Sequence, residues 1–95
     1  MMVTVYVDWG SHKILTMEQF EEEVALFVKE LKNDNYEYNE RLYNFLEEKH
    51  LDIVDMFYMS ETDKEALREE FEEWLVRDAE EQLLNEEFDE VKLEL

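Results

Sequence analysis

The sequence predicts one α+β domain, in which an N-terminal β-hairpin and a C-terminal strand form a small antiparallel sheet. Three to four helices cover one face of this sheet, in the order ββα(αα)αβ. Two observations carry this prediction: apolar residues alternate at both ends of the chain, and they recur at helical spacing between the ends. A third is that the 95 residues include no Pro and a single Gly, so no flexible linker divides residues 1–95 and one modest core is expected.

The first and last elements are predicted from strict alternation. In MVTVYVD, residues Val3, Val5 and Val7 alternate with the side chains between them, which is typical of a strand with one buried face. Gly10 supplies a turn, and HKIL at 12–15 is long enough for a short returning strand. The C-terminal VKLEL alternates in the same way, and the N-terminal hairpin is the only sheet available to receive it.

A helix is predicted immediately after the hairpin. Thr16 followed three residues later by Gln19 fits a capping box, which marks a helix start. The apolar residues that then recur at helical spacing are Met17, Phe20, Val24, Phe27, Val28 and Leu31. They form the clearest amphipathic pattern in the chain, and NDN at 33–35 can end this helix and cap the next.

The middle of the chain allows alternatives. Apolar spacing predicts a helix from Tyr38 to about His50, whereas residues 51–59 fit either a short further helix or an extended segment. The tyrosines of this region are expected in the core and its rim. The last long helix starts at Ser60 or at Thr62, and Thr62 with Glu65 fits a second capping box.

The apolar stripe of the last helix changes direction along its length. Its first part is Leu67, Phe71 and Trp74, and its second part is Leu75, Ala79 and Leu83. The second stripe is rotated from the first by about a quarter turn. Either the helix bends or breaks near Arg77 and Asp78, or it passes from one packing neighbour to another. We expect Asp78 to be a boundary carboxylate partly in water.

Charge is the strongest constraint on partners. The chain has 28 Asp and Glu against 9 Lys and Arg, a formal charge of −19, with 45% hydrophobic residues that are sufficient for folding. Such a surface repels nucleic acid and anionic membrane, so cationic partners are expected. If residues 61–90 were all helical they would carry one carboxylate per roughly 3.2 Å, close to the roughly 3.4 Å phosphate spacing of one DNA strand.

Catalytic and metal chemistry are poorly supported. There is no Cys, His12 and His50 are the only histidines, and no Ser or Thr lies in a nucleophile motif. We therefore expect no enzyme activity, no catalytic residue, no cofactor and no metal site, because neither Asp52 with Asp55 nor the EEE at 21–23 belongs to a calcium loop. His50 is expected to compensate a helix dipole. No signal peptide or membrane span is predicted, and a cytoplasmic location is expected.

The stretches VTVYVDWGSHKILTMEQFEEEV and MSETDKEALREEFEEWL resemble short acidic proteins of unknown role from phages and integrated elements of Gram-positive bacteria. These proteins have a VYVD-type strand, a turn, a second short strand and acidic helices. The resemblance implies a phage or mobile-element origin and carries no catalytic residues to transfer. In size and charge alone, the chain is also similar to DNA-mimic inhibitors of restriction enzymes and CRISPR nucleases.

Our leading hypothesis is a nucleic-acid mimic whose carboxylates occupy the basic groove of a host nuclease, restriction or CRISPR effector, or regulator. The partner is thus a basic nucleic-acid-binding host protein, with no direct contact to nucleic acid or membrane, and the chain is a monomer or homodimer. The predicted binding residues are Glu69, Glu70, Glu72, Glu73, Glu80, Glu81, Glu86, Glu87, Asp89 and Glu90. The alternative is a structural, chaperone-like or antitoxin-type partner that binds through a Tyr and Met surface, with the charge serving only solubility.

Overall fold

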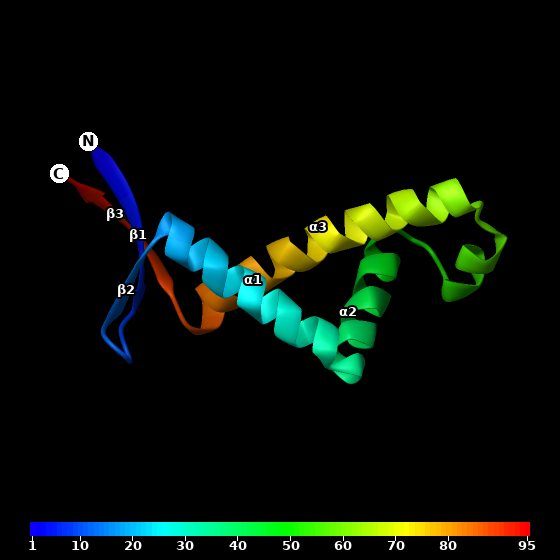
Figure 1. The fold of residues 1–95 in the computed structure, drawn as a ribbon, viewed down its shortest axis with the longest axis horizontal. Helices are drawn as coiled ribbons and strands as arrows, with labels where there is room; N and C mark the ends of the chain where they lie inside the picture. The colour runs from blue at the N-terminus through cyan, green and yellow to red at the C-terminus, as the bar shows by residue number, and fades with distance from the viewer.

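The structure, a computed structural model, describes residues 1–95 and confirms the predicted α+β arrangement. The elements in order are β1 (Met2–Asp8), β2 (Lys13–Thr16), α1 (Met17–Asn33), α2 (Asn35–Glu48), the 3₁₀ helix η1 (Ile53–Tyr58), α3 (Glu61–Glu86) and β3 (Asp89–Glu94). The molecule is elongated, with extents of 54 × 28 × 19 Å. Figure 1 shows the sheet at one end, with all the helices extending from one side of it.

The sheet has the strand order β2-β1-β3, with both pairs antiparallel. The C-terminal strand therefore joins the hairpin as predicted. In the register, Val5 of β1 lies opposite Thr16 of β2 and Val91 of β3. Residues that lie directly opposite one another in antiparallel strands share a face of the sheet, so this register decides which side chains point toward the helices.

The face that packs against the helices is the one predicted to be polar. Tyr6 is buried, and its ring stacks on Phe20 of α1 with centroids 3.9 Å apart. Leu15 lies opposite Tyr6 and is buried beside it. Val3, Val5 and Val7, which were predicted to face the core, point to the other side of the sheet. There Val3 and Val5 are partly exposed, whereas Val7 is buried outside the two core clusters. The prediction was wrong because alternation distinguishes two faces without showing which one the helices cover.

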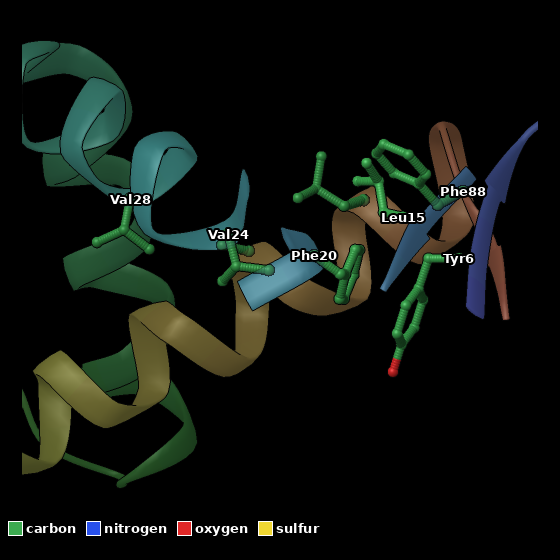
Figure 2. Packing of buried hydrophobic residues seen from close by; sticks show 8 residues of the cluster. Tyr6, Leu15, Phe20, Val24, Val28 and Phe88 are labelled. Atoms are coloured by element: carbon green, nitrogen blue, oxygen red, sulfur yellow. The ribbon is translucent and has the colours of Figure 1, made fainter. Parts of the chain in front are cut away.

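The core consists of two separate clusters. The first lies between the sheet, α1 and the C-terminal half of α3, and Figure 2 shows Tyr6, Leu15, Phe20 and Phe88 converging on the helix-facing side of the sheet. Its buried members are Tyr6, Leu15, Phe20, Val24, Val28, Ala79, Leu83 and Phe88. The second cluster joins α2 to the N-terminal half of α3 and has the buried members Phe45, Leu46, Phe71 and Leu75.

These two clusters account for the rotation of the apolar stripe in α3. The helix runs without a break from Glu61 to Glu86, so it passes from one packing neighbour to another. Phe71 and Leu75 pack on α2, whereas Ala79 and Leu83 pack on α1 and the sheet. Asp78 lies between the two clusters, and its side chain is 33% exposed, as expected for a boundary carboxylate.

Helix starts follow the predicted signals with one exception. Both hydrogen bonds of the Thr16–Gln19 capping box are present, at 3.0 and 3.3 Å. Asp34 caps α2 by accepting from the backbone N–H groups of Tyr36 and Glu37. For α3 the second capping box is wrong, because Ser60 is the N-cap and its hydroxyl accepts from the Asp63 N–H at 3.2 Å.

Two histidines adopt positive φ angles where glycine is usual. Gly10 lies in the hairpin turn as predicted, and the positive φ of this turn, 55°, belongs to His12. The Asp8 carboxylate holds this turn by accepting from the N–H groups of Gly10 and Ser11. His50 follows α2 with φ 57°, and the Leu51 N–H bonds to the Leu46 carbonyl at 2.9 Å, which is a Schellman-type helix end.

Within residues 51–59, Ile53–Tyr58 form η1, so the structure confirms the short helix and not the extended segment. Met56 packs against the second cluster, whereas much of the remaining apolar surface of η1 is open. The tyrosine prediction is also corrected, because Tyr38 alone of the four in this region is partly buried. The exposed large side chains here are Tyr36, Tyr43, Ile53, Val54, Phe57 and Tyr58. Figure 1 shows η1 at the end of the molecule opposite the sheet.

Candidate functional site

The ten predicted binding carboxylates lie on α3, at its C-cap and on β3. All are exposed except Glu72 and Glu80, which are half-buried. They do not share one face. At about 100° per residue, Glu69, Glu73 and Glu80 fall within a narrow row along the helix, and we call these three the outer row. The others are distributed around the cylinder, so the carboxylates resemble a nucleic acid in charge density and not in the path of a phosphate backbone.

Four of the ten carboxylates already have partners within the chain. Glu72 pairs with Lys32 of α1 at 2.7 Å, and Glu70 pairs with Lys49. Asp89 accepts a hydrogen bond of 2.7 Å from the indole N–H of Trp9, and Glu86 accepts one of 3.3 Å from the Gln82 amide. The other six of the ten make no side-chain hydrogen bond or ion pair in the chain, and they are Glu69, Glu73, Glu80, Glu81, Glu87 and Glu90.

Helix α1 contributes a further carboxylate that the sequence pattern did not single out. Glu21 and Glu80 line opposite walls of a groove between α1 and α3, whose floor is formed by the apolar side chains of Phe20, Val24, Ala25 and Val76. No Lys or Arg lines this groove. We call it the acidic groove. A helical spacing argument on α1 alone could not have found it, because the facing wall comes from a helix about 60 residues later in the chain.

Carboxylates of the acidic groove and of β3 act together on the phenol of Tyr6. Burial raises the pKa of the Tyr6 phenol above its usual value of 10.0, and the negative charges of Glu90, Glu80 and Glu21 raise it further. An added phenolate charge would be desolvated and would face three like charges. Two predicted binding residues, Glu80 of α3 and Glu90 of β3, thus raise the pKa of the same phenol. Glu21 of α1, which was not among the predicted binding residues, has the same effect.

The surface of α3 around Trp74, which Glu73 of the outer row borders, has a different character. There Glu48, Glu70, Glu73 and Glu81 alternate with Lys49 and Arg77 around Trp74. The Trp74 indole N–H donates to Glu48 at 2.6 Å. Lys49 and Arg77 are thus interspersed among the carboxylates of this surface, whereas no Lys or Arg lines the acidic groove.

The C-terminus of α3 carries acidic groups where basic groups are favourable. Its last turn has no Lys or Arg, Glu86 is its last residue and Glu87 is its C-cap. Each carboxylate near the negative end of a helix dipole opposes the helix by about 0.3–1 kcal/mol. In addition, Glu69 and Glu73 are like charges four residues apart, which adds a few tenths of a kcal/mol. These positions reduce stability, and no intramolecular contact at Glu87, Glu69 or Glu73 offsets the cost.

One acidic side chain of α3 has a structural partner that the sequence did not indicate. Arg41 of α2 donates to Asp78 at 3.1 Å, to Gln82 at 2.7 Å and to Glu37 at 2.6 Å. Its side chain is 12% exposed, the lowest exposure of any basic residue in an ion pair. Asp78 therefore holds α2 on α3 and is not part of the free acidic surface.

The remaining surfaces offer little for catalysis. No group of three or more His, Asp or Glu side chains comes together in a way that could hold a metal ion. His12 and His50 are both exposed. A small apolar pocket between α2, η1 and α3 is lined by Tyr38, Leu42, Phe45, Met56, Leu67 and Phe71, with Lys64 and Arg68 at its edge. None of the helices has the length and apolar character that crossing a membrane requires.

Comparison with protein-family models, curated proteins and solved structures finds no match. The acidic groove is lined by unpaired carboxylates and by no Lys or Arg, whereas Glu73 of the outer row also borders Lys49 and Arg77.

Proposed function

We propose that the protein is an acidic interaction protein that occupies the basic nucleic-acid-binding groove of a host protein. The binding surface consists of the outer row, the acidic groove with Glu21, and Glu90 at the sheet end. The target is a nuclease, a restriction or CRISPR effector, or a regulator in the cytoplasm of a bacterial host. The resemblance to acidic proteins of phages and integrated elements suggests the same setting. No direct contact with nucleic acid or membrane is involved.

The observation that carries the proposal is the set of carboxylates without partners on an ordered helix. Glu69, Glu73 and Glu87 make no intramolecular contact that offsets their mutual repulsion or their opposition to the helix dipole. A fold that is locally less stable than its sequence could allow is often found at functional sites. A cationic partner supplies the missing compensation, because each carboxylate gains a Lys or Arg contact on binding.

The mechanism is competitive occupancy. A net charge of −19 attracts a basic groove over a distance of about one Debye length, roughly 8–10 Å at physiological salt, and accelerates association. The apolar floor of the acidic groove, formed by Val24, Ala25 and Val76, suits the aliphatic stems of Lys and Arg side chains. Their charged ends then reach Glu21 and Glu80 on the two walls.

Charge reversal in the outer row tests the proposal. We compare the protein with the triple variant Glu69→Lys, Glu73→Lys and Glu80→Lys in affinity capture from bacterial host lysate at low and physiological salt. Captured proteins are identified and their dissociation constants measured. We expect the variant to lose capture, and wild-type binding to weaken steeply as salt rises.

A matched control separates the outer row from net charge. The triple variant Glu40→Lys, Glu47→Lys and Glu94→Lys changes three exposed, unpaired carboxylates elsewhere. Each reversal adds two charges, so both triple variants change the net charge from −19 to −13. The control should retain most of the affinity. Equal loss in both variants, or full binding by the outer-row variant, would show that the outer row is not the binding site.

A second candidate function is supported by the exposed apolar surface of η1. Phe57, Tyr58 and Val54 are exposed, and Tyr43 and Ile53 line a groove between α2 and η1. Tyr is enriched at protein interfaces, so a structural, chaperone-like or antitoxin-type partner could bind here while the charge has no part in recognition. Salt discriminates the two functions, because apolar association does not weaken as ionic strength rises.

A further inference from the structure

The sheet has a second face that the helices do not cover. The register places Val7 opposite Ile14, Val5 opposite Val91, and Val3 opposite Leu93. Because opposite residues share a face, these side chains point away from Tyr6 and the helices. Val7 is buried on this face, Val3, Val5 and Val91 are partly exposed, and Ile14 and Leu93 are exposed. Figure 1 shows the helices leaving from one side of the sheet and nothing on the other.

Hydrogen bonds extend this face at both ends. The Trp9 indole donates to Asp89, which lies opposite Val7, so the Trp9 side chain reaches the same side of the sheet. At the other end, backbone hydrogen bonds pair Met1 with Leu95. We call the whole surface the outer face. Its members are Met1, Val3, Val5, Val7, Trp9, Ile14, Thr16, Asp89, Val91, Leu93 and Leu95.

The outer face is almost uncharged in a chain of which 39% is charged. Asp89 has its single charged side chain, and this carboxylate already accepts the hydrogen bond from the Trp9 indole. The large side chains are nevertheless open, since Ile14 is 65% exposed, Trp9 63% and Leu93 42%. Contiguous apolar patches of this kind mark association surfaces.

We propose that the outer face binds a second copy of this chain, so that the two three-stranded sheets pack face to face in a symmetric dimer. The proposal does not depend on the proposed function. Taking roughly 200 Å² for a large side chain, the exposed fractions of Met1, Trp9, Ile14, Leu93 and Leu95 amount to roughly 650 Å² per copy. Two copies then remove roughly 1,300 Å², which lies within the about 1,200–2,000 Å² of stable interfaces.

Charge favours a second copy as the occupant. A basic partner finds no free carboxylate on the outer face, whereas two copies approaching by any acidic surface would repel each other. Packing by the outer face brings together the one uncharged layer of each copy. It also sends the two α3 helices in opposite directions, far beyond the roughly 8–10 Å over which charges interact at physiological salt. Sheets packed in this way form a sandwich with about 10 Å between layers.

The test is the mass and length of the chain in solution. By light scattering at about 100 µM we expect a mass near 23 kDa, twice the 11.7 kDa of one chain. Small-angle scattering should give a maximum dimension of roughly 100 Å, about twice the 54 Å of one copy, because the sheets meet at one end of each molecule. Added salt should leave the dimer unchanged or tighten it.

Variants of exposed residues locate the interface. The double variant Ile14→Lys and Leu93→Lys places four cations in a symmetric interface and should weaken dimerisation at least about a hundredfold. The matched control Phe57→Lys with Val54→Lys makes the same change on the apolar surface of η1 and should leave the dimer intact. Circular dichroism checks folding in each case, and acrylamide quenching of Trp9 fluorescence on dilution provides a readout from the unmodified chain.

Three results would overturn the proposal. They are a wild-type chain that stays monomeric at about 100 µM, a dimer that persists in the folded Ile14 and Leu93 variant, and a dimer that the Phe57 and Val54 control abolishes. A chain that stays monomeric and binds a different protein through its outer face would overturn the proposal in the same way as the first result. Loss of dimerisation with retained binding of the captured host protein would leave the proposed function standing.

Discussion

Replacing Arg41 by alanine removes the cation that joins α2 to α3 between the two core clusters. Its guanidinium donates to the side chains of Asp78, Gln82 and Glu37 at distances of 2.6 to 3.1 Å, and its side chain is 12% exposed. Hydrogen bonds to charged groups contribute about 1.5–3 kcal/mol each. Asp78 is 33% exposed and can recover water, so we expect Arg41→Ala to lower the free energy of unfolding by about 2 kcal/mol in total.

Urea unfolding followed by circular dichroism at neutral pH measures this loss. For a domain of this size, about 2 kcal/mol corresponds to a fall in Tm of roughly 8–16 °C. Arg68→Ala is the matched control, because Arg68 is exposed, has no ion pair and should change stability by less than about 0.5 kcal/mol. In a double-mutant cycle, Arg41→Ala and Asp78→Asn should be coupled by about 1 kcal/mol. A loss in Arg41→Ala no larger than in the control would refute the structural role of this network.

Two further predictions concern Tyr6 and His50. The raised pKa of Tyr6 means that its contribution to stability is complete below about pH 10 and is lost as pH rises through the higher folded pKa. One of five phenols should thus titrate late in ultraviolet absorbance, and Tyr6→Phe should abolish that phase and flatten the alkaline loss of stability. If all five phenols titrated together, burial and the carboxylates near Tyr6 would not be raising its pKa. For His50, whose φ is 57°, His50→Gly should raise the free energy of unfolding by about 0.5–1 kcal/mol and His50→Ala should leave it nearly unchanged, as urea unfolding will show.

The fold follows from local signals that the sequence carries clearly. The Thr16–Gln19 capping box places the start of α1 to the residue, and period-two alternation in MVTVYVD and VKLEL marks the strands that pair as β1 and β3. Both signals depend only on residues close together in the chain. The capping error at Thr62 has the same local origin, because Ser60 offers an equivalent hydroxyl two residues earlier and forms the cap instead.

What the sequence could not show depends on contacts between distant segments. Alternation in β1 defines two faces, and the stacking of Tyr6 on Phe20 decides which one the helices cover. The binding of Arg41 to Asp78, 37 residues away, has no sequence signature. The same limit applies to the candidate site. Lys32 and Lys49 neutralise two predicted carboxylates, and the approach of α1 to α3 adds Glu21.

The central claim is that the acidic surface takes the place of a nucleic acid in a basic groove. The most direct test is a competition experiment on the host protein captured through the outer row. The two competing ligands are this chain and the nucleic acid that the host protein binds. We expect the two ligands to exclude one another, so that increasing amounts of this protein displace the nucleic acid completely, whereas the outer-row variant does not displace it. A stable ternary complex containing the host protein, its nucleic acid and this chain would contradict the claim.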